Sequence, residues 1–92
     1  KRMPAVNVAE RFGQNLVRLR QESGLTQEEL AVRASVHRTQ IGLLEAGKRQ
    51  PRIETLAKLA GALAVDSGQL MEGIVWVPPA TGTGSFEIFE GK

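Results

Sequence analysis

The sequence contains no cysteine and a single histidine, His37. The absence of cysteine excludes disulfides and thiolate metal sites, and it permits a cytoplasmic location without requiring one. No cluster of His, Cys and Asp residues supports metal ligation, so we expect no metal and no cofactor. A lone histidine before a helix is more often a cap or a phosphate contact than a catalyst.

Long apolar runs are also missing. None approaches the roughly 20 residues needed to cross a bilayer, and the N-terminus lacks the pattern of a signal peptide. The chain has no nucleophile–base pair and no glycine-rich phosphate loop. Its 92 residues form one small domain, too small to enclose a deep catalytic cavity. We therefore expect a cytoplasmic protein that is neither an enzyme nor a membrane protein.

The formal net charge of +2 is unevenly distributed along the chain. Residues 1–63 contain eleven Lys and Arg against six Asp and Glu, a balance of +5. Residues 64–92 contain only Lys92 against Asp66, Glu72, Glu87 and Glu90, a balance of −3. A basic front and an acidic tail are typical of a body that faces a polyanion, although many solvated helices are basic without any such partner.

The apolar spacing predicts an all-α fold of five helices, followed by a short two-stranded β element. We expect helices from residue 8 to a stop at Ser23 and Gly24, from 26 to 34, from 38 to a stop at Ala46 and Gly47, from about Pro51 to 63, and from Asp66 or Ser67 to 71. The fourth helix is expected to have an apolar face made of Ile53, Leu56, Leu59, Ala60 and Leu63. Residues 1–5 show no pattern and are expected to form a frayed arm.

The segment TQEE at residues 26–29 predicts a capping box. In it the Thr26 hydroxyl accepts from the Glu29 amide, and the Glu29 carboxylate accepts from the Thr26 amide. A tight turn at residues 35–37 would set the next helix across the second, at roughly 90–120°. Ile41 and Leu44 would hold that helix down and leave its other side exposed. A helix so presented fits the major groove of B-DNA, which is about 12 Å wide.

The pattern changes after Gly73. IVWV at 74–77 and FEIF at 86–89 are β-branched and aromatic and favour two strands, whereas the Pro- and Gly-rich residues 78–85 exclude regular structure. We therefore divide the chain into a helical domain, residues 6–72, and a C-terminal β tail, residues 73–92. An isolated hairpin is only marginally stable, so the tail should pack on the helices or on a second chain.

Four segments together resemble one family. LTQEELA at 25–31, ASVHRTQI at 34–41, LEAGKRQP at 44–51 and TLAKLA at 55–60 are similar to the Cro/repressor-type (XRE-like) helix-turn-helix family of DNA-binding proteins. The similarity spans about residues 8–72. It implies a repressor-like domain whose third helix enters the major groove of double-stranded DNA.

The resemblance implies base-reading residues on the third helix. Arg38 and Thr39 match the first reading positions, since a guanidinium pairs with guanine and a threonine meets thymine through its methyl or offers its hydroxyl. Arg38 is equally suited to a phosphate contact. Gln40 reaches a base or a phosphate, or packs beside the second helix. Leu43 matches a further reading position, often polar or basic in relatives, where leucine either contacts thymine methyls or is less involved.

Gln27 matches the family's phosphate-binding residue at the start of the second helix, where free amides and the helix dipole also favour an anion. The competing interpretation is that Gln27 is simply a good helix former. The other expected phosphate contacts are Thr26, His37, Lys48, Arg49 and Arg52, and the basic residues among them are also compatible with a plain solvated surface. Arg20 and Glu45 match a buried structural ion pair of the family.

The resulting prediction is a DNA-binding transcriptional regulator, a homodimeric repressor on a two-fold symmetric operator. The expected dimerisation residues are Ile74, Trp76, Phe86, Ile88 and Phe89, unless the tail folds back on its own helices. The alternative function is an antitoxin-like or adaptor module whose tail binds another protein.

Overall fold

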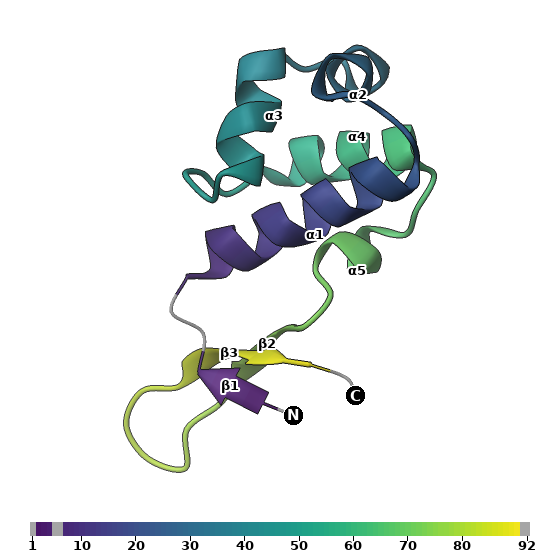
Figure 1. Ribbon diagram of the computed structural model, residues 1–92. Helices are drawn as coiled ribbons and strands as arrows, with labels where there is room; N and C mark the ends of the chain where they lie inside the picture. Colours follow the sequence, from purple (N-terminus) through teal and green to yellow (C-terminus); the bar gives the residue numbers. More distant parts are fainter. Residues whose placement is uncertain (1, 5–6, 91–92) are drawn as a thin grey trace.

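The computed structural model describes residues 2–4 and 7–90 of the chain. Five helices form the upper part of the molecule and a small antiparallel sheet lies beneath them (Figure 1). The elements are β1 (Arg2–Pro4), α1 (Val8–Glu22), α2 (Gln27–Ala34), α3 (Arg38–Glu45), α4 (Ile53–Leu63), α5 (Ser67–Leu70), β2 (Ile74–Val77) and β3 (Ser85–Phe89). The predicted five-helix fold with a C-terminal β hairpin is confirmed. In the part of the chain that the structure describes, no helix has the length and apolar character needed to cross a membrane.

Local side-chain chemistry fixes the helix ends. The capping box predicted at α2 is present: the Glu29 amide donates to the Thr26 hydroxyl (3.0 Å), and the Thr26 amide donates to the Glu29 carboxylate (2.9 Å). Asp66 caps α5 in the same way with Gln69. The chain leaves α1 through Gly24, whose φ of +71° lies in the left-handed region that glycine adopts without strain.

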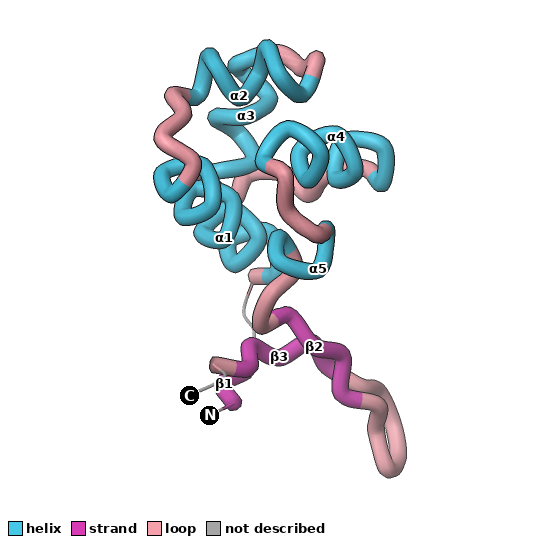
Figure 2. Tube along the Cα trace, turned by 90° about the vertical axis from the view of Figure 1, so that its right-hand side faces the viewer, coloured by secondary structure: helices cyan, strands magenta, loops and turns pink. Residues whose placement is uncertain are grey.

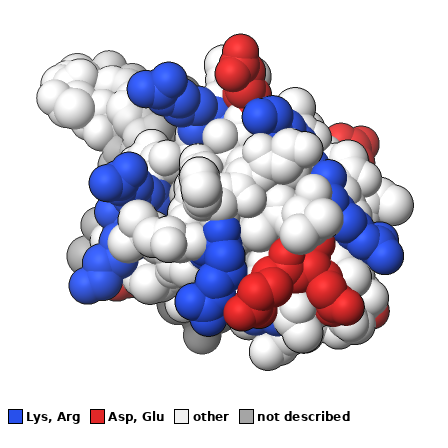
Figure 3. All heavy atoms as spheres, turned by 90° about the horizontal axis from the view of Figure 1, so that it is seen from above, with Lys and Arg blue, Asp and Glu red and all other residues white. Residues whose placement is uncertain are grey.

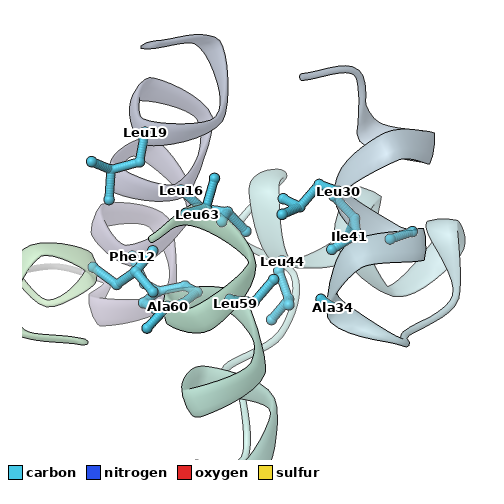
Figure 4. Close-up of a cluster of buried hydrophobic side chains, with 12 residues drawn as sticks. Phe12, Leu16, Leu19, Leu30, Ala34, Ile41, Leu44, Leu59, Ala60 and Leu63 are labelled. Atoms are coloured by element: carbon cyan, nitrogen blue, oxygen red, sulfur yellow. The ribbon is translucent and has the colours of Figure 1, made fainter. Parts of the chain in front are cut away.

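The helices enclose one hydrophobic core, in which side chains from α1, α2, α3 and α4 converge (Figure 4). Its fully buried large members are Phe12, Leu16, Leu30, Ile41, Leu44, Leu59 and Leu70. The predicted apolar face of α4 is wrong at its first residue, because Ile53 is 85% exposed. Ile53 is the first residue of α4, immediately after its N-cap, and the buried side of the helix begins at Thr55.

The sheet has three strands in the order β1–β3–β2, so the expectation of a frayed N-terminal arm is wrong for residues 2–4. Met3 pairs with Ile88, and Ile74 pairs with Ile88 from the other side. Strand β1 has no alternating pattern and ends in Pro4, which an edge strand tolerates because one side of its backbone needs no partner. Figure 2 shows the sheet below the helices, with the loop after β2 extending away from the body.

Polar side chains of α1 attach the sheet to the helices. Asn15 is 3% exposed, and its amide nitrogen donates to the carbonyls of Leu70 and Glu72, both at 2.9 Å. Arg11 donates to the Glu72 carbonyl (3.1 Å) and to the Glu90 carboxylate (2.6 Å). The link from α5 to β2 is therefore fixed on α1.

Candidate nucleic-acid interface

Helix α3 has one buried side and one exposed side. Ile41 and Leu44 are 0% and 1% exposed and hold the helix to the core. Arg38 and Thr39 lie at its N-terminal end and are exposed to solvent. The turn before α3 passes through Ser35, whose φ of +56° reverses the chain within a few residues. The turn thus presents the start of α3 at the surface, as the sequence predicts.

The first reading candidate, Arg38, has a partner on the neighbouring helix. Its Nε lies 3.3 Å from the Glu28 carboxylate in an exposed ion pair between the beginnings of α2 and α3. No local pattern in the sequence marks Glu28, because an acidic residue in the first turn of a helix is ordinary. Figure 3 looks onto this end of the molecule and shows acidic groups directly beside basic ones.

Gln27 is turned toward the protein. Its side-chain amide donates to the Glu45 carboxylate at 2.8 Å and is partly buried, so it connects the start of α2 to the end of α3. At the same helix start, the capping box engages the Glu29 backbone amide. The backbone amides of Gln27 and Glu28 then remain as donors for an anion. Through its contact with Glu45, the Gln27 side chain braces the start of α2 against the end of α3.

Beneath this site lies the Arg20–Glu45 ion pair that the resemblance implies. The Nε of Arg20 donates to Glu45 at 2.6 Å and its Nη2 at 3.1 Å, and the two side chains are 14% and 6% exposed. The hydrogen bond to Glu45 raises the pKa of the Arg20 guanidinium above its ordinary value, and the charges of Glu45 and then Glu28 add to the effect. Arg20 also donates to the Leu25 carbonyl, so it joins α1, the α1–α2 turn and α3.

A shallow hollow runs from α3 toward α4. Its lining comprises His37, Thr39, Gln40, Leu43, Arg49, Arg52, Glu54 and Thr55. Within it the Gln40 amide donates to the Thr55 hydroxyl at 3.4 Å, which directs Gln40 toward α4. His37 is the N-cap residue of α3 but makes no side-chain capping bond. Lys48 is exposed in the same loop as Arg49.

The predicted tail residues divide between two faces of the sheet. Because side chains alternate along a strand, the register places Ile74, Trp76, Phe86 and Ile88 on one face and Phe89 on the other. Ile74 packs on the helical core, whereas Trp76 and Phe86 are 52% and 48% exposed. Their rings meet edge to face with centroids 5.1 Å apart. The tail therefore folds back at its near end and leaves an aromatic pair uncovered at its far end.

The groups exposed on this surface are charged or can form hydrogen bonds. Within residues 2–4 and 7–90, no three His, Asp or Glu side chains lie together so as to hold a metal ion. Four residues that contact the site or hold the tail were not predicted from the sequence: Glu28, Thr55, Arg11 and Asn15. Each is a common polar residue whose partner is distant in the chain, so no local pattern marks it.

Known proteins similar to this chain are regulators of transcription. The helix-turn-helix family model (HTH_3) matches residues 16–70. The HTH-type transcriptional regulator y4dJ of Sinorhizobium fredii is 44% identical over 59 residues, 64% of this chain and 77% of the relative. The control protein C.BamHI of Bacillus amyloliquefaciens is 33% identical over 67 residues, 72% of this chain and 83% of the relative.

Solved structures agree with these relatives. The restriction-modification controller protein C.AhdI of Aeromonas hydrophila has a TM-score of 0.66 at 37% identity, covering 67% of this chain and 94% of that one. The clp gene regulator ClgR of C. glutamicum has a TM-score of 0.68 at 27% identity, covering 73% and 87%. These homologues are regulators rather than enzymes.

Proposed function

Because the chain belongs to the Cro/repressor-type helix-turn-helix family of transcriptional regulators, we propose that it is a homodimeric repressor that binds a two-fold symmetric operator. In this proposal α3 docks in the major groove and the protein acts on DNA in the cytoplasm. The observation that carries it is the division of α3 into a fully buried side, with Ile41 and Leu44, and an exposed N-terminal end, with Arg38 and Thr39. Such a helix meets a groove without unfolding any of the core.

The exposed end of α3 supplies the base contacts. Arg38 offers a guanidinium for guanine, and Thr39 offers a hydroxyl and a methyl. Leu43 is half-buried and faces the hollow, where it suits a thymine methyl. Gln40, engaged with Thr55, has a free carbonyl oxygen and a second N–H for a base edge.

Phosphate contacts surround this end on two sides. At the start of α2, the free amides near Thr26 and Gln27 suit one phosphate. Across the hollow, His37, Arg49 and Arg52 suit the other side of the groove, with Lys48 beyond them. These contacts orient α3 on the duplex and favour no particular sequence.

A second copy of the chain would supply the rest of the specificity. One helix of eight residues reads too few bases for tight binding, whereas two helices about 34 Å apart read successive major grooves. The exposed Trp76–Phe86 pair suits the dimer contact, since half-exposed aromatic side chains at the far end of a sheet favour burial against a partner. Ile74 and Ile88 lie on the same face and support the pair from the helical side.

Selection of duplexes from a random pool tests the proposal. We expect a palindromic consensus with half-sites about 10 base pairs apart. If each protomer contacts about four phosphates, the slope of log K against log salt should be near −7 for the dimer. Recovery of no consensus, together with a flat salt dependence, would refute DNA recognition. A promoter containing the selected site should be transcribed less when the protein is present, and increased transcription would reverse the sign of regulation.

One observation favours a second candidate, an adaptor or antitoxin-like module. Strand β2 lies at the edge of the sheet, and among the described strands only β3 pairs with it. Its outer side could therefore take a strand from another protein. A protein that adds a strand there would also cover Trp76. Quenching or a spectral shift of the single tryptophan by a co-purified native partner, and not by a second copy, would support this candidate.

A further inference from the structure

The Glu28 carboxylate has an unusual position for a surface that faces DNA. It is exposed, at 67% of its side-chain area, at the start of the helix that precedes the reading helix. A negative charge there repels phosphate, so it weakens binding to every duplex. The presence of an acidic residue at this position is explained if it improves discrimination between DNA sequences.

Hydrogen bonds of the neighbouring residues fix the backbone position of Glu28. Its neighbour Gln27 donates to Glu45, which is held in turn by two hydrogen bonds from Arg20. On the other side, the capping box closes the first turn of α2 through Thr26 and Glu29. The backbone of Glu28 therefore has little freedom, and its side chain extends from a fixed point to reach Arg38 at the start of α3.

The contact with Arg38 is made on the Nε side of its guanidinium, where Nε lies 3.3 Å from a Glu28 carboxylate oxygen. An arginine that reads guanine donates two N–H groups to O6 and N7 of the base. The terminal nitrogens of the guanidinium carry four further N–H groups for such a pair of bonds. Exposed ion pairs contribute little to stability in water, so this pair costs the free protein almost nothing to keep or to lose. On a duplex, water is excluded and the same carboxylate restricts the plane of the guanidinium more strongly.

We propose that Glu28 is a specificity-determining positioning residue, which orients Arg38 toward guanine and disfavours its use as a general phosphate contact. This inference rests on the proposed function, in which Arg38 reads a base. It also resolves the two roles that the sequence leaves open for Arg38. A guanidinium held through its Nε side by an acid is directed to a base edge, whereas a free one is drawn to the nearest phosphate.

The test compares Glu28→Gln with Glu54→Gln on a selected duplex and on duplexes changed at one base pair. Glu54 is the control, an exposed carboxylate that lies at the hollow between α3 and α4 and for which the described structure gives no ion pair to Arg38. We expect both variants to bind all duplexes more tightly, because each removes one negative charge. Only Glu28→Gln should lose preference for guanine at the base pair that Arg38 reads. We expect the ratio of affinities for the selected and the changed duplex to fall by about 3- to 10-fold, which is part of the discrimination that one bidentate contact gives.

A double-mutant cycle with Arg38→Ala separates this role from a structural one. In the Arg38→Ala background, Glu28→Gln should change no base preference, since its effect acts through the guanidinium. The inference is overturned if Glu28→Gln keeps the wild-type preference, or if it lowers the preference equally without Arg38. Equal unfolding midpoints for the two Gln variants show that the comparison is between folded proteins. If Arg38→Ala leaves the consensus unchanged, the inference fails and the proposed function stands; if no duplex is selected at all, both fail.

Discussion

Gly13 lies where α1 passes closest to the C-terminal end of α3. A β-carbon added there would come within 2.5 Å of the Leu44 carbonyl oxygen and 2.7 Å of that of Glu45. Backbone atoms cannot move aside as a flexible side chain does, so the two helices would have to separate. The close approach also brings Arg20 of α1 to Glu45, so this one small residue permits the ion pair beneath the site.

We expect Gly13→Ala to lower the free energy of unfolding by about 1–3 kcal/mol, the usual cost of overpacking, despite the better helix propensity of alanine. Gly61 of α4 is the matched control, because nothing lies within 4 Å of a β-carbon there. Gly61→Ala should stabilise the protein by up to about 1 kcal/mol. Denaturant titration of both variants measures the difference, and a stabilised Gly13→Ala would contradict the close approach.

The Arg20–Glu45 pair should be worth far more than the surface pairs. Glu45→Gln leaves the Arg20 guanidinium with little solvent and without its paired carboxylate, so we expect a loss of about 3 kcal/mol in the free energy of unfolding. Glu22→Gln, which removes the exposed i,i+4 partner of Arg18, should cost less than about 1 kcal/mol. Equal losses in the two variants, measured by denaturant unfolding, would mean that the Arg20–Glu45 pair is effectively solvated.

At the scale of the element, the beginning of α2 makes the stability depend on pH. Hydrogen bonds from the Thr26 backbone amide, then from its side chain, lower the pKa of the Glu29 carboxyl below its ordinary value. A group with a lowered pKa in the folded state contributes stability above its unfolded pKa, and that contribution is lost as the pH falls through the folded pKa.

We therefore expect the wild type to lose more stability than Glu29→Gln when the pH is lowered below about 4.3. Glu54→Gln serves as the control, since Glu54 takes part in no capping box. Thermal unfolding from pH 7 to pH 2.5 measures the difference between the three proteins. Parallel profiles for wild type and Glu29→Gln would show that the capping box does not form in solution.

At neutral pH, Thr26→Ala should lower the free energy of unfolding by about 1 kcal/mol, because the N-cap of α2 is lost.

At the scale of the whole molecule, the proposed dimer would form through the sheet. Asn15 and Arg11 fix its near end on α1, so the uncovered Trp76–Phe86 pair has a defined direction relative to α3. A dimer made through that pair would hold two reading helices at a set distance. The tail would then determine the spacing of the half-sites that the protein accepts.

We expect the chain to sediment as a dimer at tens of micromolar without DNA. Trp76→Ala should weaken the dimer by about 2 kcal/mol or more, roughly 30-fold in Kd, as central aromatic residues of interfaces do. Phe89→Ala is the control, because Phe89 is similarly exposed on the opposite face of the sheet and should have little effect. A wild-type monomer at these concentrations would rule out the tail dimer, and a larger effect of Phe89→Ala would place the contact on the other face.

The sequence by itself determined the helices, their ends and the family. The 3.6-residue spacing of Phe12, Leu16 and Leu19 and the capping residues Thr26 and Asp66 act within one or two turns, so a local pattern is sufficient to find them. The Arg20–Glu45 pair was also available, although only through the resemblance, because nothing local connects residues 25 positions apart.

Only the tertiary structure decided the contacts between distant segments. It paired Arg2–Pro4 with β3, exposed Ile53, attached the tail through Asn15, and placed Glu28 beside Arg38. For the three contacts among these, the partner lies on another segment of the chain, and the packing of buried side chains determines which polar groups at the surface come within reach. The sequence predicted that α3 reads DNA; the packing of α2 against α3 decided which acid lies beside Arg38.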